Sequence, residues 1–327
     1  MSDEVLDLRR LGTGTVPLQA LLFLSTGIGV AAGLLLLALA STIAVAFVPG
    51  GFIASLGAIV TTAAYAAQLV AVGIAAVILI PLGATLAAHL KLRDTARFIV
   101  EKSGAKVLPD SNRAGSAVAA MARKAGLPGP PRYGVLENEI NALALGASRE
   151  EALVLVGRPL GQILQPAEIM AIIGHELGHI AMDDSKRKLM AMGHQEFLFR
   201  FLVNAGLQRW ARSVFGLIGE LALAAHSRER EFWADAVGAY VTSKADMMAA
   251  LAKLDAVDHP PTTQLERDYA PLMLRAGRSS LFASHPSMAE RIQALEAETY
   301  LRRLPVRQVE ARVDEPAEMP AAVYDGI

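Results

Sequence analysis

Apolar residues follow two different patterns along this chain. Between residues 11 and 90 no Asp, Glu, Lys or Arg occurs, so the apolar tract is far longer than the ~18 residues that indicate a transmembrane helix. One proline and two glycines at 49–51 interrupt the tract, which predicts two spans over residues 16–48 and 52–90. Each segment exceeds the ~20 residues that cross the hydrocarbon core, so we expect spans that are tilted or extend beyond the bilayer.

The residues that flank this tract predict its orientation. A buried hairpin of a soluble protein would carry a polar stripe, and a cleaved signal peptide would be shorter and would have no second span behind it. Basic residues lie outside both ends of the tract and none lies in the short connection, so the positive-inside rule places both termini and the following domain in the cytoplasm. These basic residues are Arg9, Arg10, Lys91, Arg93, Arg97, Lys102 and Lys106.

Beyond the tract, the apolar periodicity becomes that of a mixed helix and strand domain. Residues 91–104 are expected to continue the second span as a helix, and residues 114–125 have the spacing of an amphipathic helix. Three short runs predict a small antiparallel sheet, beside a helix that begins at Pro166. These runs are 133–136, 140–145 and 153–156. The fold class we expect is α+β, mainly helical, preceded by a transmembrane helical hairpin.

The composition of successive segments predicts the domain organisation. A polar lead precedes the anchor, one catalytic domain follows it, and the chain ends in a segment rich in Pro, Glu and Ala that we expect to be a disordered tail. The expected bounds are 1–15 for the lead, 16–90 for the anchor, 91–302 for the domain and 303–327 for the tail.

A segment inside the domain, residues 194–226, is apolar but interrupted by charge. Arg200, Arg209, Arg212 and Glu220 leave no uncharged run of ~18 residues, so two further spans are disfavoured. Polar and apolar residues fall on opposite sides of a helical wheel, which predicts an amphipathic helix. We expect it to lie at the membrane interface; the alternative is packing on the domain.

The composition excludes several classes of function. The formal net charge is −1, so no basic excess indicates a nucleic-acid partner. The chain has no cysteine, which excludes disulfides, thiolate metal ligands and cysteine catalysis. Histidine and carboxylate side chains are therefore the metal ligands this chain can offer.

The predicted helix from Pro166 contains the clearest chemical motif of the chain. His175 and His179 lie four residues apart, so on a helix both imidazoles project from one face and can bind one metal ion. Glu176 lies between them and can take a proton from a metal-bound water as general base. This H-E-x-x-H pattern is typical of zinc hydrolases.

A site with two histidines needs a third protein ligand. Glu231 is the best candidate, because Asp235 lies four residues later on the same helical face and can accept the ring N–H of a ligand histidine. Glu229 is the competing acid, but it has no such partner. Asp183 and Asp184 can cap the motif helix or contact the ligands, and the sequence does not choose between these roles.

The order of the motifs resembles the HtpX-type membrane-bound zinc endopeptidases, gluzincins that are related to the CAAX prenyl proteases. The resemblance runs from about residue 126 to 295, and it departs from the family at 194–226, where the family has two further spans. It implies a zincin-like domain in which His285 helps to stabilise the oxyanion; the alternative is that His285 only precedes a helix with Pro286 at its first position. It also implies a substrate-binding edge strand formed by Asn141, Ala142, Leu143 and Ala144, with Leu143 in place of the usual aromatic residue. The matching segments are 141–144, 154–157, 227–235, and 284–286 with Arg291, Ile292 and Leu295.

The motifs and the resemblance together predict a membrane-anchored zinc endopeptidase in a bacterial inner membrane. One Zn²⁺ per chain is expected on His175, His179 and Glu231, with membrane lipid and protein or peptide substrates as partners. A CAAX-type prenyl protease is disfavoured, since two spans cannot enclose a chamber. A catalytically idle membrane-tethered scaffold is also disfavoured, because a binding protein has no need of Glu176. The sequence does not indicate the substrate or the oligomeric state.

Overall fold

The computed structural model describes most of the chain outside the apolar tract. The described residues divide between two compact units: one comprises Met1–Thr15, Lys91–Leu189 and Leu223–Ile327, and the other Val16–Leu90 and Met190–Ala222. The described residues are 2–8, 10–11, 71, 73–108, 113–204, 217–257, 274, 286–310 and isolated positions between 20 and 33.

A mixed sheet of four strands lies in the first unit. The strand order is β2-β3-β5-β4. The predicted strands are present, but the expected antiparallel arrangement is wrong for β3 and β5, which run parallel. The reason is that β5 folds back antiparallel to β4 and enters the sheet between β4 and β3, so it runs in the same direction as β3. The strands are β2 Lys106–Val107, β3 Arg132–Leu136, β4 Ala142–Leu145 and β5 Leu153–Gly157.

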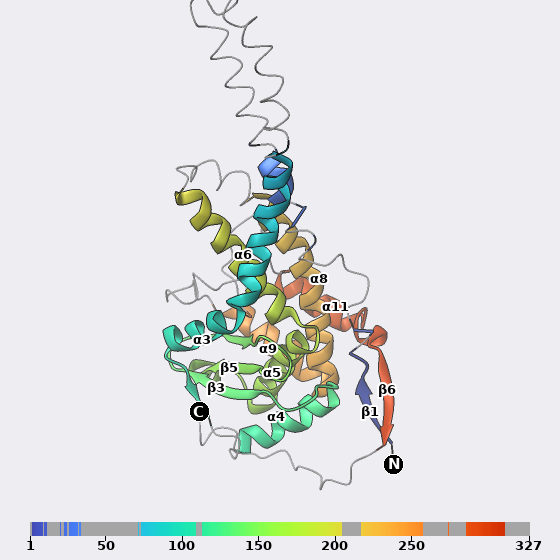
Figure 1. The fold of residues 1–327 in the computed structure, drawn as a ribbon. Helices are drawn as coiled ribbons and strands as arrows, with labels where there is room; N and C mark the ends of the chain where they lie inside the picture. The colour runs from blue at the N-terminus through green and yellow to red at the C-terminus, as the bar shows by residue number, and fades with distance from the viewer. Residues whose placement is uncertain are drawn as a thin grey trace, which may run out of the picture. The chain divides into compact units, whose positions relative to one another are not determined.

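Helix α5, Pro166–Ala181, packs against β4 and β5 and forms the centre of the unit (Figure 1). Its start agrees with the sequence: Pro166 occupies the first turn, and Glu168 and Gln165 satisfy each other's backbone N–H groups in a capping box. Nearly every side chain of α5 is buried, so this helix is a rigid base for the residues it carries.

The helices around α5 complete the first unit. Helix α9 packs against both α5 and α11, and Lys253 of α9 lies 2.7 Å from the Glu168 carboxylate at the start of α5. Residues 92–103 are helical as predicted, but α3 is a separate helix with Lys91 as its N-cap and does not continue the preceding helix. It ends at Gly104, whose φ of 64° suits glycine. The described helices of this region are α3 Leu92–Ser103, α4 Arg113–Lys124, α8 Leu217–Val241, α9 Lys244–Ala256 and α11 Met288–Glu296.

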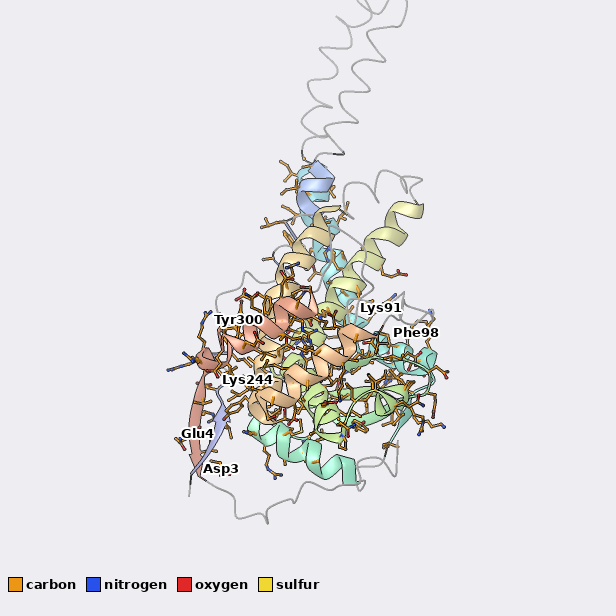
Figure 2. All side chains as sticks on the ribbon, turned by 180° about the vertical axis from the view of Figure 1, so that it is seen from behind. Asp3, Glu4, Lys91, Phe98, Lys244 and Tyr300 are labelled. Carbon is orange, nitrogen blue, oxygen red and sulfur yellow. The ribbon has the colours of Figure 1, made fainter. Side chains whose placement is uncertain are left out.

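A second, two-stranded sheet joins the two ends of the described chain. β1, Ser2–Leu6, pairs antiparallel with β6, Val306–Glu310. The expectation of a tail without structure from residue 303 is therefore wrong for 306–310, because all five residues pair with β1. Tyr300, which is labelled in Figure 2, comes just before β6. Its ring stacks on Phe232 of α8 with ring centroids 5.2 Å apart. The rest of the expected tail, 311–327, lies outside the described residues.

The second unit contains a strongly apolar helix. Among the described residues one helix, Gly73–Leu90, is long and apolar enough to cross a membrane, with a mean hydropathy of 2.0. Its large side chains are exposed, as lipid-facing residues would be. They include Ile74, Ile78, Leu79, Leu82, Leu86 and Leu90. Most of the first predicted span and the turn at 49–51 lie outside the described residues, as do residues 205–216 of the insert.

A polar contact links segments of this second unit. Helix α6, Asp184–Asn204, carries His194, whose Nε2 lies 2.9 Å from Thr26 Oγ1 and whose Nδ1 lies 3.3 Å from Thr85 Oγ1. The neighbouring Gly193 allows close approach, because a Cβ there would lie 3.2 Å from the Cα of Ala88. The start of the insert therefore packs on the apolar tract, as the division into two units also indicates.

Candidate active site

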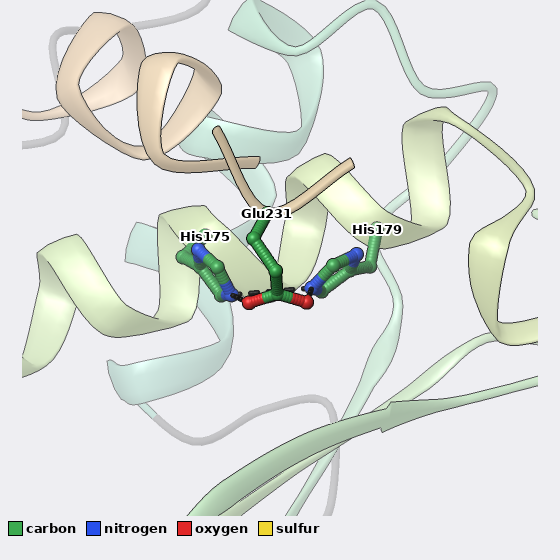
Figure 3. A group of neighbouring side chains, drawn as sticks. All are labelled: His175, His179 and Glu231. Atoms are coloured by element: carbon green, nitrogen blue, oxygen red, sulfur yellow. Dashed lines mark hydrogen bonds and ion pairs between the residues drawn. The ribbon is translucent and has the colours of Figure 1, made fainter. Parts of the chain in front are cut away.

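The two histidines of the motif converge on one point. His175 and His179 occupy successive turns of α5, and their Nε2 atoms lie 3.1 Å apart (Figure 3). Both side chains are buried. The predicted helical spacing is thus realised in the structure.

Glu231 of α8 provides the third group of the cluster. Its Oε1 lies 3.4 Å from Nε2 of His179 and its Oε2 lies 3.7 Å from Nε2 of His175 (Figure 3). The three ligand atoms all lie within 4.8 Å of one another. Glu229, the competing acid, is exposed and accepts a hydrogen bond from Trp233 Nε1 at 3.4 Å instead. The structure therefore brings together the three residues that the sequence singled out as ligands.

Close contact between α5 and α8 holds this arrangement. A Cβ at Gly178 would lie 2.9 Å from the Cα of Ala234, and one at Gly174 would lie 3.1 Å from the Cα of Gly238. Two glycines four residues apart on α5 therefore let the backbone of α8 approach along the face that carries the histidines. This small separation brings Glu231 within reach of both imidazoles.

Each ligand histidine has an acidic partner on its other ring nitrogen. Nδ1 of His175 lies 2.9 Å from Oδ1 of Asp235, and Nδ1 of His179 lies 3.1 Å from Oδ2 of Asp184. A carboxylate accepts the Nδ1–H proton, which leaves the Nε2 lone pair directed toward the cluster. Asp235 thus has the contact that the sequence predicted. Of the two acids left open, Asp184 makes the corresponding contact.

Asp183 has a different place. It adopts a left-handed conformation with φ of 58° in the turn after α5, and its carboxylate lies 2.8 Å from Arg149. Asparagine and aspartate tolerate this conformation better than most residues. The turn redirects the chain so that Asp184, at the start of α6, points back to His179.

Glu176 is a buried acid without a hydrogen-bond partner in the structure. It is 1% exposed, and neither of its carboxylate oxygens contacts a donor among the described residues. Burial raises the pKa of Glu176 to about 7. A carboxylate in this state can exchange a proton near neutral pH, as a general base must.

Buried cations balance the acids around the cluster. The side chain of Arg291 on α11 donates to Asp235, with Nε 2.8 Å from Oδ2, and Arg230 donates to Asp184 across 2.8 Å. Burial alone would raise the pKa of each aspartate, but the arginines outweigh it and hold both pKa values below their usual range. Both aspartates are therefore ionised and can hold the imidazole protons.

The ring nitrogens that face each other are suited to a metal ion. Burial lowers the pKa of His175 to about 4, whereas Glu231 and Asp184 outweigh burial and raise the pKa of His179 to about 9. Two Nε2 lone pairs and a carboxylate meeting at such short distances repel one another unless a cation lies between them. A proton on His179 supplies part of the positive charge that reduces this repulsion. A divalent metal would satisfy all three donors, so the residues fit a zinc ion bound by two histidines and a carboxylate.

The structure gives less information on two other predicted parts of the site, His285 and the substrate strand. His285 lies outside the described residues, although α11 begins close behind it. The alternative that Pro286 opens that helix is wrong, because Ser287 is the N-cap and Met288 the first helical residue. The expected substrate strand lies at the edge of the sheet, as β4 with the preceding Asn141, and its side chains are all buried.

Sequence reasoning missed several buried charges of the site. Arg230 and Arg291 lie in the matched motif segments, which assign them no role, and Lys188 lies outside those segments. Lys188 lies on α6 four residues after Asp184, and its Nζ is 3.6 Å from Oε1 of Glu231. The sequence gives no signal for this burial, because an acid and a lysine four residues apart usually form an exposed pair on a helix surface.

Metalloendopeptidases share three features with this site: two histidines on one helix, a glutamate between them in the sequence, and a carboxylate from a second helix. The comparisons place the protein in that class. The profile of Peptidase family M48 matches residues 110–299. The chain belongs to this family.

Individual relatives agree with this assignment. Protease HtpX of Thioalkalivibrio sulfidiphilus is 32% identical over 203 residues, which make up 54% of this chain and 68% of that protein. The Protease HtpX homolog of Variovorax paradoxus is 33% identical over 213 residues, or 58% of this chain and 72% of that protein. The crystal structure of S. mikatae Ste24p aligns with 61% of this chain and 53% of its own at 16% identity and a TM-score of 0.38, which does not establish a common overall fold.

Proposed function

We propose that this protein is a membrane-anchored zinc endopeptidase that holds one Zn²⁺ per chain on His175, His179 and Glu231. The observation that carries the proposal is the convergence of these three groups within 4.8 Å, beside the buried Glu176, which has no hydrogen-bond partner among the described residues. Family membership supports the same activity.

The residues of the site have distinct roles in peptide hydrolysis. Bound zinc supplies Lewis acidity, which acidifies water and polarises the scissile carbonyl. Glu176 accepts the proton of the attacking water and then delivers it to the leaving amine. Asp235 and Asp184 keep the imidazoles oriented throughout. We assign His285 to the oxyanion, on the resemblance of its segment to the family motif.

Substrate would bind as an extended segment along β4. An edge strand can pair its backbone with a peptide, and residues 141–144 form such an edge one layer from the motif helix. The N–H group of Leu274 donates to the carbonyl of Ala142 across 3.0 Å, so one acceptor of this edge is used by the chain itself. A substrate that pairs along the whole edge would displace that contact.

The anchor places this activity at a membrane. The exposed apolar surface of Gly73–Leu90 fits a lipid environment, and we assign 16–48 and 52–90 as two spans with the catalytic domain in the cytoplasm of a bacterial cell. Membrane proteins and membrane-proximal proteins are then the substrates within reach, as quality control requires. We assign 194–226 to the lipid interface rather than to further spans.

Two experiments test this proposal. Metal analysis of the detergent-solubilised protein should find about one zinc per chain, and the loaded protein should digest casein in a chelator-sensitive manner. Zinc without proteolysis would indicate a scaffold, and no zinc would overturn the proposal.

The second experiment tests the topology of the chain in the membrane. Single cysteines can be placed at Gly51, Gln208 and Ala322, since the natural chain has none. Labelling of Gly51 from outside and Ala322 from inside is expected; labelling of Gln208 from outside would refute the two-span arrangement.

A further inference from the structure

Lys188 is a buried cation in direct contact with the third ligand. The residue is 7% exposed, and its Nζ lies 3.6 Å from Oε1 of Glu231. Burying an ammonium group is costly unless a negative charge lies beside it. A lysine at this position is therefore explained by the carboxylate it faces.

The two oxygens of Glu231 have matching surroundings. Oε1 faces Nε2 of His179 at 3.4 Å and the Lys188 ammonium at 3.6 Å. Oε2 faces Nε2 of His175 at 3.7 Å and Nη1 of Arg291 at 3.5 Å. Each oxygen of the third ligand thus lies between one imidazole and one fixed cation.

The charges of the site show which cation serves Glu231. Arg291 is engaged by Asp235 through two hydrogen bonds, and Arg230 by Asp184. Among the buried cations described at the site, Lys188 forms its ion pair with Glu231, and its charge also acts on Asp184. The buried acids of the site are Glu176, Asp184, Glu231 and Asp235, and the buried cations are Lys188, Arg230 and Arg291.

We propose that Lys188 is the counter-cation of Glu231 and sets how tightly the metal centre holds its ion. This inference rests on the proposed metal site. The ammonium offsets one negative charge beside the metal position, so the dication is bound less tightly than by two histidines and an unopposed carboxylate. Lys188 acts through Glu231, so it is a positioning residue. A ligand whose charge is partly neutralised leaves the metal a stronger Lewis acid.

A bracing role for Lys188 is the competing explanation. If the lysine only fixed α6 against α8, its removal would loosen the cluster and weaken metal binding. If it offsets charge, its removal makes the site one unit more negative and strengthens metal binding. Coulomb's law at the effective dielectric of protein interiors makes one unit charge within a few ångströms of a dication worth at least about tenfold in affinity. The two explanations therefore predict opposite signs.

The test is zinc affinity, measured by competition with a chelator at fixed pH on the full-length protein in detergent. Lys188→Met and Lys188→Gln should bind zinc at least about tenfold more tightly than the wild type. Lys188→Arg keeps the charge and should remain close to the wild type. Lys186→Met is the matched control, because Lys186 lies on the same helix without a contact to the cluster. If Lys188→Met does not fold, Lys188→Gln carries the test.

The failures of the two proposals can be told apart. A wild-type protein that binds no stoichiometric zinc overturns the proposed function and this inference with it. A wild type that binds zinc, with unchanged or weaker binding in the Met and Gln variants, overturns the role of Lys188 alone. Tighter binding in Lys188→Arg would show that charge is not the cause. As a second readout, zinc should raise the unfolding temperature of Lys188→Met by more than that of the wild type.

Discussion

Asp235 lies with Oδ1 2.9 Å from Nδ1 of His175, although the two residues are 60 positions apart in the sequence. Asp235 follows the third ligand, Glu231, by four residues on α8. One helix thus contributes both an acid of the proposed metal cluster and the acid that contacts one of its histidines. A displacement of α8 would therefore disturb two functions together.

Replacing Asp235 by Asn should weaken metal binding and the fold. The variant loses the charge that holds the His175 tautomer, which typically costs about 10–100-fold in metal affinity. It also removes the closest ionic partner of the buried Arg291, for which we expect a loss of about 3–5 kcal/mol in the free energy of unfolding. Zinc titration and denaturant unfolding measure the two effects. Asp255→Asn, an exposed change on α9, is the control and should alter neither.

Alanine at His175, at His179 or at Glu231 should abolish stoichiometric zinc binding, because each change removes one of three protein donors. Glu229→Ala is the matched control, since Glu229 is exposed and contacts Trp233. Metal analysis after gel filtration gives the result. Full zinc in Glu231→Ala combined with loss in Glu229→Ala would show that the other acid is the ligand.

Glu176→Gln should separate proteolysis from metal binding. The substitution keeps the shape of the side chain and removes its ability to take a proton, so turnover should fall by at least about 10²-fold while zinc content and unfolding temperature stay near the wild type. Casein digestion with parallel metal analysis provides the measurement. Nearly unchanged proteolysis would refute the assignment of Glu176 as general base.

Zinc binding should release a proton near neutral pH. Glu231 and Asp184 outweigh burial and raise the pKa of His179 in the metal-free protein to about 9, so this imidazole is protonated at pH 7. The metal needs the same lone pair, so affinity should rise by about tenfold per pH unit below that pKa and level off above it. Calorimetry in buffers of different ionisation enthalpy counts the protons. His175 contributes none in this range, because burial lowers its pKa to about 4. An affinity that does not change between about pH 7 and 8 would contradict this prediction.

Gly178→Ala should force α5 and α8 apart. The new Cβ would lie 2.9 Å from the Cα of Ala234, which is backbone and cannot rotate away. We expect a loss of about 1–3 kcal/mol in the free energy of unfolding, together with weaker zinc binding as Glu231 moves from the histidines. Gly129→Ala, which meets open space, controls for the loss of glycine flexibility. Equal behaviour of the two variants in both assays would count against the close helix contact.

Local periodicity determined which parts of the site could be predicted. His175 and His179, like Glu231 and Asp235, are related by the i, i+4 spacing of one helix, and the structure places each pair as expected. Asp184 could not be chosen over Asp183, because its direction depends on the left-handed turn after α5. The spacing of residues along the sequence does not predict such a turn.

Tertiary contacts account for what the sequence did not reveal. Arg291 reaches Asp235 from a helix 56 positions away, and β1 pairs with β6 from the opposite end of the chain. The parallel pairing of β3 and β5 likewise follows from the position β5 takes in the sheet, which three short strands do not specify by themselves. In each case the partner is distant in sequence and leaves no local pattern.

The donor atoms of the metal cluster are nitrogen and oxygen, and the chain contains no cysteine. Zinc centres built from thiolates lose their metal when peroxide oxidises the sulfur to sulfenic or higher acids. Imidazole and carboxylate groups do not enter that chemistry, so oxidants that disable thiolate centres should leave this cluster intact. Peroxide treatment should therefore leave the metal content of this protein unchanged.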